Sequence, residues 1–244
     1  MIKKNIDIVI PVYNEGELII DTIKSIQNNF NYSFNILICF DLDNDNTLTA
    51  IENSSLDKRN IFFIKNKFKG AHGAVMTGIN NSISDIILVI PADDDYNTIE
   101  IQNMYEFMIN SHIDVLCPDR FIKKNSIING PFVKFLIVRI VNFSLYYFAK
   151  VKTKDATNGF RFFSRRVINN IKIDSRTGFI YSLEYLVKSI EKKYKIDRYP
   201  AKWIERKKGK SRFTILKWSL DYLYWYFYAF KIRLNKNKNK NEKK

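Results

Sequence analysis

Residues 6–15 read IDIVIPVYNE, an apolar run that is followed directly by a proline and a group of polar residues. The apolar run 6–10 has the length and composition of a strand that is buried on both faces, as in a parallel sheet. The polar residues after it would form a loop at the carboxyl end of that strand. Ligands bind at this end in open parallel sheets, so the segment predicts a functional loop.

Apolar runs and amphipathic segments alternate from this strand to about residue 117. Strands are expected at 6–10, 34–40, 61–64, 86–90 and 114–117, and helices at 15–29, 46–53, 74–83 and 99–110. Such an alternation is typical of an α/β domain with a mostly parallel sheet flanked by helices. The later pattern predicts helices at 132–149, 182–190 and 214–234, and strands at 160–163 and 196–204.

The composition fits a globular domain with an anionic partner. The chain has 244 residues, of which 46% are hydrophobic, and this excludes wholesale disorder. Its net charge of +15 lies in the later part, because residues 1–100 carry 8 Lys and Arg against 14 Asp and Glu. Cys39 and Cys117 lie in apolar runs and are expected to be buried thiols. With no recognised secretory signal or membrane span, we expect a cytoplasmic protein.

Two groups of aspartates follow predicted strands. Asp93, Asp94 and Asp95 come after the strand at 86–90, where three adjacent carboxylates would repel one another unless a cation is bound. In an extended segment Asp93 and Asp95 would point the same way, and Mg²⁺ or Mn²⁺ prefers such oxygen ligands. A solvated acidic turn is the alternative. The aspartates at 41–45 lack the Gly and Glu of an EF-hand.

The segment KGAHGA at residues 69–74 opens a predicted helix, so its backbone N–H groups could meet an anion. Its spacing matches neither the dinucleotide-binding motif nor the P-loop. The two histidines, His72 and His112, have no partners that suggest a catalytic triad. We expect both in loops or at the surface.

Taken together, these motifs resemble the family 2 glycosyltransferases, which have the GT-A fold. The matching segments are, in order, IVIPVYNE at 8–15, 41–47, 69–78, 93–95, DATNGFR at 155–161, and 199–211. They cover residues 6 to about 212. The branch they resemble most is that of the dolichyl- and undecaprenyl-phosphate sugar transferases.

The resemblance implies a Rossmann-like GT-A domain of a nucleotide-diphospho-sugar transferase over residues 1–212. Residues 1–118 would bind the nucleotide-sugar, and residues 119–212 would bind the acceptor. An aromatic interfacial helix at 213–234 and a disordered basic tail at 235–244 would follow.

The apolar and aromatic segment YLYWYFYAF at residues 222–230 is too short to span a bilayer. Its Tyr and Trp side chains favour a lipid–water interface, and Lys231 and Arg233 follow it. We therefore expect a peripheral protein on the cytoplasmic face of an anionic membrane. A buried core helix or a dimer face is the alternative.

The resemblance also implies roles for individual residues. Those expected to bind the donor nucleotide are Pro11, Tyr13, Glu15, Asp41, Lys69 and Asp93. Those expected to bind an acceptor phosphate are Arg120, Arg139, Asn142, Arg161, Arg206 and Ser211. Asp93 and Asp95 would hold Mg²⁺ or Mn²⁺, and the expected catalytic residues are these two and Arg161.

Two positions depart from the family pattern. Pro91 stands where the metal motif usually has its first aspartate, so either Asp93 and Asp95 form a shifted pair or metal binding is weak. Phe40 replaces the first of the paired aspartates before Asp41. The choice between a UDP-sugar and a GDP-sugar therefore cannot be carried over.

We expect an inverting, metal-dependent hexosyltransferase that moves a sugar from a UDP- or GDP-sugar to undecaprenyl or dolichyl phosphate. A lipid phosphate is already a nucleophile at neutral pH, so no general base is needed. The alternative acceptor is a saccharide hydroxyl in cell-surface polysaccharide assembly, which needs a base such as Asp155 or Glu184. A nucleic-acid partner is not expected, because no binding motif accompanies the positive charge. Pro91 leaves a non-catalytic homologue as a further alternative.

Overall fold

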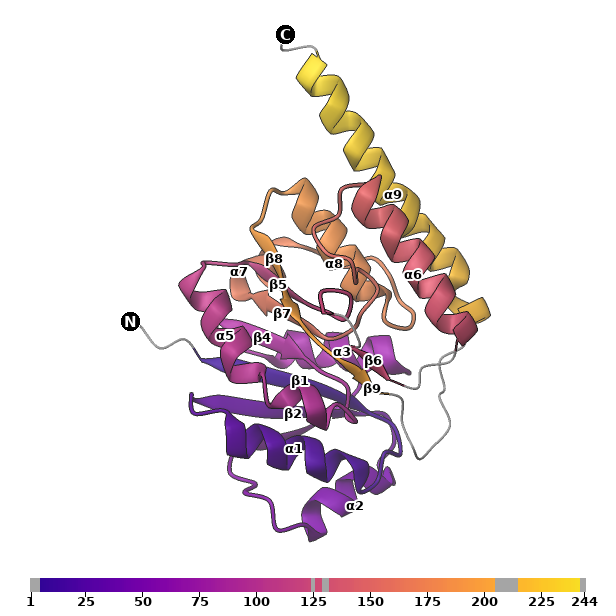
Figure 1. Cartoon of the computed structure of the whole chain (residues 1–244). Coiled ribbons are helices and arrows are strands. Elements are labelled where there is room, and N and C mark those ends of the chain that lie inside the picture. Colours follow the sequence, from indigo (N-terminus) through magenta and orange to yellow (C-terminus); the bar gives the residue numbers. More distant parts are fainter. Residues whose placement is uncertain (1–4, 124–125, 129–131, 205–214, 242–244) are drawn as a thin grey trace.

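The computed structural model describes residues 5–123, 126–128, 132–204 and 215–241, and a seven-stranded sheet lies at its centre (Figure 1). The strands are β1 (Ile6–Val12), β2 (Phe34–Phe40), β3 (Ile61–Lys65), β4 (Ile86–Val89), β5 (Val115–Asp119), β7 (Arg161–Ser164) and β8 (Ile196–Pro200). Their order in the sheet is β3-β2-β1-β4-β7-β5-β8. All pairs are parallel except those of β7, which runs antiparallel to β4 and β5. The predicted α/β fold with a mostly parallel sheet is confirmed.

Helices cover both faces of the sheet. On one face, α1 (Leu18–Asn29) and α5 (Ile101–Asn110) share a core with Ile8 and Ile10. On the other face, α3 (Ala71–Asn81) and α8 (Ile180–Glu191) share a core with Val9. Successive residues of β1 therefore enter different cores, which is why this strand carries apolar residues on both faces. The shorter helices are α2 (Asn46–Asn53), α4 (Asp95–Thr98) and α7 (Arg165–Asn170).

Two long helices form an additional layer outside α8. α6 (Phe132–Tyr147) and α9 (Ile215–Asn241) lie side by side (Figure 1), and the hydroxyls of Ser144 and Tyr226 are 2.8 Å apart. Among the described residues, no helix combines the length and the apolar character that a bilayer span requires. α9 also continues through most of the segment predicted to be a disordered tail. Once a helix is formed, each added residue gains a hydrogen bond without a new nucleation step.

The segment 196–204, predicted as one strand, forms two. β8 ends at Pro200, which has no N–H to donate to a ladder, and β9 (Trp203–Ile204) leaves the main sheet. β9 pairs instead with β6 (Ile127–Ile128) in a separate two-stranded sheet.

The topology concentrates several loops at one edge of the main sheet. β1 pairs with β2 on one side and with β4 on the other. Successive strands are therefore added in one direction from β1 to β3, and β4 is added on the opposite side of β1. In such sheets a crevice forms outside the carboxyl ends of the strands at the switch point. Because β7 is antiparallel, its first residue, Arg161, lies at this same edge opposite Val89. The loops after β1, β2, β4 and β5 and the loop before β7 therefore come together there.

Gly78 in α3 lies directly against β1 and β2. A Cβ at this position would overlap with Val9 Cγ1 and would lie 2.7 Å from Cys39 Sγ. Cys39 and Cys117 are buried free thiols, as predicted, and burial raises the pKa of Cys39 to about 12.

We expect Gly78→Ala to lower the free energy of unfolding by about 1–2 kcal/mol, because overpacking outweighs the gain in helix propensity. Denaturation in urea measures the change. Asn80→Ala, at an exposed position of the same helix, is the control and should change stability little. A Gly78→Ala protein as stable as the wild type would contradict the close packing of α3 on the sheet.

Candidate active site

The loop after β4 carries three adjacent aspartates in three different environments. Asp93 is half-buried, whereas Asp95 is exposed because the chain turns there into α4 instead of continuing extended. Asp94 is 6% exposed, and its two carboxylate oxygens accept hydrogen bonds from Asn97 Nδ2 at 2.8 and 2.9 Å. Burial, with a smaller contribution from the charges of Asp93 and Asp95, raises the pKa of Asp94 to about 7. The carboxylates at 93 and 95 are therefore the accessible members of the group.

The donor set of this loop is compatible with a divalent cation that is shared with a substrate. Within the described residues, no three His, Cys, Asp or Glu side chains gather closely enough to hold a metal by themselves. Mg²⁺ is commonly held by only one or two carboxylates together with the phosphates of a substrate. Asp93 and Asp95 provide such oxygens at the carboxyl edge of the sheet, two and four positions after Pro91. These oxygens are of the kind that Mg²⁺ or Mn²⁺ binds together with the phosphates of a substrate.

The loop after β1 is tied to the start of α2. The backbone N–H of Asn14 donates to Asp45 Oδ2 at 2.9 Å, and that of Glu15 donates to Thr47 Oγ1 at 2.9 Å. Asn14 has a φ of 53°, which gives the loop a sharp bend. These contacts hold the segment that carries three of the residues expected to bind the donor nucleotide. Pro11 and Glu15 are half-buried, and Tyr13 is 43% exposed.

Asp41, one of the residues expected to bind the donor nucleotide, directly follows β2 and is held from two sides. Its Oδ1 accepts from Asn66 Nδ2 at 2.6 Å, and its Oδ2 accepts from the backbone N–H of Gly70 at 2.8 Å. Lys69 is exposed beside Gly70 at the start of α3. The structure therefore places Asp41 and Lys69 on adjoining loops of the same edge.

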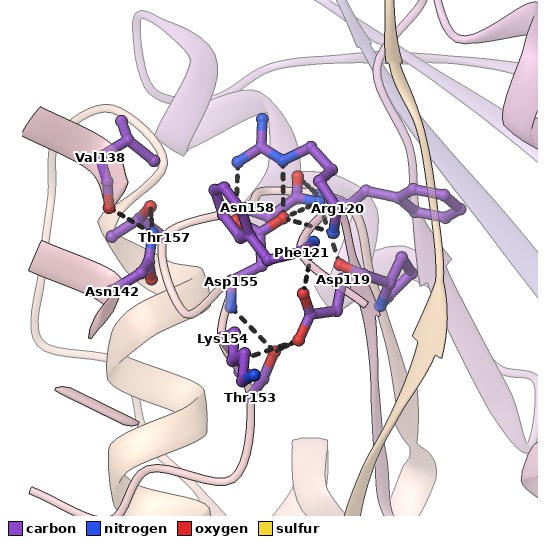
Figure 2. A network of polar contacts seen from close by, with 12 residues as sticks. Asp119, Arg120, Phe121, Val138, Asn142, Thr153, Lys154, Asp155, Thr157 and Asn158 are labelled. Atoms are coloured by element: carbon purple, nitrogen blue, oxygen red, sulfur yellow. Dashed lines mark hydrogen bonds and ion pairs between the residues drawn. The ribbon is translucent and has the colours of Figure 1, made fainter. Parts of the chain in front are cut away.

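A buried polar network joins the end of β5 to the loop before β7 (Figure 2). Asp155 is fully buried and makes a bidentate ion pair with Arg120, at 2.6 Å from Nε to Oδ2 and 2.7 Å from Nη2 to Oδ1. Asp119 is also fully buried and accepts from Thr153 Oγ1 at 3.0 Å and from the backbone N–H of Lys154 at 2.8 Å. Although burial lowers the pKa of Arg120, the charge and hydrogen bonds of Asp155 raise it above its usual value. Arg120 is thus a fixed cation at the edge of the site.

Arg161 and Asn142 hold the same loop from the sheet and from α6. Arg161 is fully buried, and its Nη2 donates to the backbone oxygens of Asp155, Ala156 and Asn158 at 3.3, 3.2 and 2.9 Å. Asn142 is 1% exposed, and its Oδ1 accepts from the N–H of Ala156 at 2.7 Å. Both side chains contact this loop instead of solvent. The phosphate contact that the sequence predicts for both residues stays a prediction, and in this structure both side chains hold the loop.

Arg139 differs from Arg161, because it is exposed on α6. Its guanidinium carbon lies 5.7 Å from the ring centroid of Phe121 and 5.8 Å from that of Phe135. Contact with ring faces leaves the edge of a guanidinium able to bind an anion. Two further acceptor candidates, Arg206 and Ser211, lie outside the described residues.

The two candidate general bases are both fully buried. Asp155 is occupied by its ion pair, and Glu184 accepts from the backbone N–H groups of Asp174 and Ser175 at 2.7 and 2.9 Å. Neither is placed to take a proton from an incoming hydroxyl. His72, expected in a loop or at the surface, is instead buried in α3 with Nε2 3.1 Å from Ser175 Oγ. Burial lowers its pKa.

Comparison with known sequences identifies the family. The sequence profile described as Glycosyl transferase family 2 matches residues 7–172. The chain belongs to this family. It is 24% identical over 229 residues to the dolichol-phosphate mannosyltransferase of Pyrococcus furiosus. This match covers 90% of this chain and 64% of that protein. It is 34% identical over 96 residues to an undecaprenyl-phosphate 4-deoxy-4-formamido-L-arabinose transferase of Yersinia pestis, covering 37% of this chain and 29% of that protein.

Solved structures support the same fold. The glucosyl-3-phosphoglycerate synthase from Mycobacterium tuberculosis, in complex with UDP, has a TM-score of 0.72 at 13% identity. The match covers 93% of this chain and 80% of that chain. The fold of this glycosyltransferase is accordingly GT-A-like.

Two residues that organise this edge, Asn66 and Asp119, are not among the candidates predicted from the sequence. Asn66 directly follows β3, so its place at the carboxyl end of a predicted strand was the available signal. Asp119 is the last residue of β5 and is fully buried. Two of its partners, Thr153 and Lys154, lie 34 and 35 positions away, and spacing in the sequence does not reveal them.

Asp155→Asn in this glycosyltransferase should lower the free energy of unfolding by about 3–5 kcal/mol, because it leaves Arg120 without its counter-charge. Asp43→Asn, which removes an exposed ion pair with Lys65, is the matched control and should cost about 0–1 kcal/mol. Urea denaturation of both variants provides the comparison. Equally small losses would mean that the buried pair does not hold the loop.

Proposed function

We propose that this protein transfers a sugar from a nucleotide-sugar donor to a polyprenyl phosphate at the cytoplasmic face of a membrane. The observation that carries the proposal is an exposed apolar surface on α6 and α9, which we call the α6–α9 face. Its members, all at least 42% exposed, are Leu136, Ile137, Ile140, Phe143, Tyr147, Leu223, Tyr224, Phe227 and Leu234.

The arrangement of the α6–α9 face favours a lipid surface as its partner. Residues 136, 140, 143 and 147 recur at the spacing of one side of a helix, and α9 lies beside α6 (Figure 1). Large exposed apolar patches mark interaction sites. The exposed Lys150, Lys152 and Lys231 lie next to these helical stripes in the sequence, and such cations are attracted to anionic lipid headgroups.

Arg139 gives this face its proposed acceptor. An arginine among apolar side chains at a membrane is costly unless it meets an anion, and a polyprenyl phosphate presents a phosphate at the membrane surface. Arg139 contacts Phe121, which directly follows Arg120 at the end of β5. The proposed phosphate site therefore lies between the α6–α9 face and the carboxyl edge of the sheet.

A phosphate acceptor also agrees with the state of the two carboxylates considered as bases. A phosphate oxygen is already deprotonated near neutral pH, so transfer to it needs no proton acceptor. Asp155 and Glu184 are both buried and engaged. A saccharide hydroxyl would need a base that neither of them can supply in this arrangement.

On the donor side, Asp41 would bind the base and Lys69 the phosphates. Asp93 and Asp95 would hold Mg²⁺ or Mn²⁺. When bound, the ion would neutralise the negative charge that develops on the leaving diphosphate. The structurally similar synthase has been crystallised with Mn²⁺ and UDP-glucose, which supports this assignment of the edge. The similarity of this chain to a dolichol-phosphate mannosyltransferase supports the proposed acceptor.

Asp93→Asn is expected to reduce transfer by about 100-fold or more, because a metal ligand contributes several kcal/mol of transition-state stabilisation. The measurement is sugar transfer at saturating donor, with Mn²⁺ and again with EDTA. Asp57→Asn, in an exposed turn, is the control and should keep the wild-type rate. Full activity of Asp93→Asn, or of the wild type in EDTA, would contradict the metal role.

Arg139→Ala should impair transfer to a short polyprenyl phosphate by about 10- to 150-fold and leave nucleotide affinity unchanged, because it removes one charge-assisted contact to the acceptor. Arg59→Ala, exposed on a distant loop, serves as the control. The same assay compares the polyprenyl phosphate with the matching alcohol. Equal use of both acceptors would refute phosphate recognition and favour a saccharide acceptor.

A further inference from the structure

Two cationic side chains from distant parts of the chain converge on one tyrosine ring. The Lys154 ammonium lies 5.3 Å from the ring centroid of Tyr146, and the guanidinium carbon of Arg198 lies 5.4 Å from the same centroid. The Lys154 ammonium is also 5.8 Å from the ring centroid of Tyr147. Lys154 belongs to the loop before β7, whereas Arg198 lies in β8, at the edge of the main sheet. We call these four side chains the Tyr146 cluster.

The two cations of the cluster keep donors for a ligand. Among the described residues, no carboxylate oxygen lies within 4 Å of the Lys154 ammonium, and Arg198 meets only Asp119, at 3.5 Å from Nη1 to Oδ2. The two oxygens of Asp119 already accept three shorter bonds at 2.8–3.0 Å, one of them from the N–H of Lys154 (Figure 2). A carboxylate has about four acceptor positions, so Asp119 has none left for a further donor. Nε and Nη2 of Arg198 and the Lys154 ammonium therefore have no described hydrogen-bond acceptor.

The cluster borders the α6–α9 face. Tyr147 belongs to both, and the next residue, Phe148, is 63% exposed. Tyr146 follows Arg139 by seven positions, almost two turns of helix, so both lie on one side of α6, about 10 Å apart along its axis. The cluster and the acceptor site proposed at Arg139 are thus two separate positions on the same side of this helix.

We propose that the Tyr146 cluster binds the phosphate headgroup of an anionic membrane lipid, separate from the polyprenyl phosphate at Arg139. The inference rests on the proposed function, in which the α6–α9 face lies on a membrane. A guanidinium offers paired donors to phosphate oxygens, and a lysine adds a mobile charge. The tyrosine rings stabilise the cations without neutralising them, and such rings favour the level of the headgroups. A lipid bound here would hold α6 at the depth where Arg139 meets a phosphate.

The surroundings of the cluster favour a lipid over a free phosphate ion. The exposed rings of Phe143, Tyr147 and Phe148 lie beside it in the sequence and would contact acyl chains. The exposed Lys150 and Lys152 follow, and they would attract anionic lipids to this part of the surface. A free phosphate would use the cations alone and gain nothing from the apolar rings.

The test is a titration of the full-length, isotope-labelled protein with dihexanoyl phosphatidylglycerol below its critical micelle concentration. Binding is followed by NMR at the Nε–H signals of the arginine side chains, and the signal of Arg198 is assigned by its loss in Arg198→Lys. We expect saturable binding at least about tenfold tighter than that of dihexanoyl phosphatidylcholine, as one charge-assisted contact predicts. The choline cation cancels the charge of the second lipid. Inorganic phosphate, the third probe, should bind more weakly than phosphatidylglycerol.

Two double variants distinguish a site from a general attraction. Lys154→Gln with Arg198→Gln should weaken the binding of the short phosphatidylglycerol about tenfold or more. Lys150→Gln with Lys152→Gln removes the same charge from exposed positions without a described ring contact. This matched control should change the Kd by about twofold at most in physiological salt, because charges that do not touch the ligand are screened. If Arg198→Gln does not fold, Lys154→Gln alone keeps its backbone bond to Asp119 and should weaken the binding by a smaller factor.

Several outcomes would overturn the proposal. Equal losses in the two double variants would mean a general attraction, and inorganic phosphate binding as tightly as the lipid would refute the headgroup. Arg139→Ala should leave the short lipid bound, and its loss there would place the lipid at the acceptor site instead.

Sedimentation with vesicles of phosphatidylcholine and phosphatidylglycerol tests the proposed function separately. Wild-type protein that does not sediment with them would contradict the membrane contact of the α6–α9 face, and this inference with it. Wild-type protein that sediments, while the Arg198 signal does not respond to the short lipid, would contradict this inference alone.

Discussion

A fully buried carboxylate has to be paired, and at Asp155 this requirement determines how the site is assembled. Arg120 meets it with two hydrogen bonds across 35 positions of sequence. Removal of either charge would leave the other buried and unmatched, so the end of β5 and the loop before β7 keep one relative position. Asn158 adds a bond from Nδ2 to the backbone oxygen of Pro118 at 3.1 Å. This loop leads directly into β7, so these contacts also fix the position at which β7 enters the sheet.

The network extends from the ion pair into the elements on either side of the site. Asn142 connects the loop to α6, so the helix proposed to meet lipid also helps to hold the edge of the sheet. On the other side, Asn97 donates to the backbone oxygen of Lys202 at 3.0 Å and accepts from its N–H at 2.9 Å. The acidic loop after β4 is therefore anchored to the connection between β8 and β9. Both substrates of the proposed reaction would meet surfaces that are held in place by buried polar side chains.

Most of the fold could be predicted from the sequence, because the spacing of the apolar residues in each helix and strand follows which of its faces is buried. The strand at 34–40 and the helix at 46–53 have the predicted bounds. In β1, residues 6, 8, 9 and 10 are apolar because the strand is covered on both faces. The antiparallel direction of β7 was not predictable, since a short apolar strand reads the same in either direction.

The sequence indicated which residue types lie near the site. It did not indicate the direction in which each side chain points. Arg161 was selected as a phosphate ligand from its motif, yet its guanidinium points into the protein to bind backbone oxygens. Asn66 and Asp119 were missed because their roles come from partners on other strands. A motif identifies a position in the fold, but the solvent exposure of the side chain there depends on the tertiary structure.

The insertion of β7 between β4 and β5 has a consequence for how such a protein can evolve. A strand from the later part of the chain completes the sheet begun by the earlier part, with Phe162 opposite both Leu88 and Leu116. A cut near residue 118 would leave the exposed edge of β4 without its partner. The segment after residue 118 is therefore not an independent module that recombination at that boundary could exchange between homologues. Under the proposed function, new acceptor specificity would arise through changes in loops and in α6 and α9, while the interleaved sheet is inherited as a single unit.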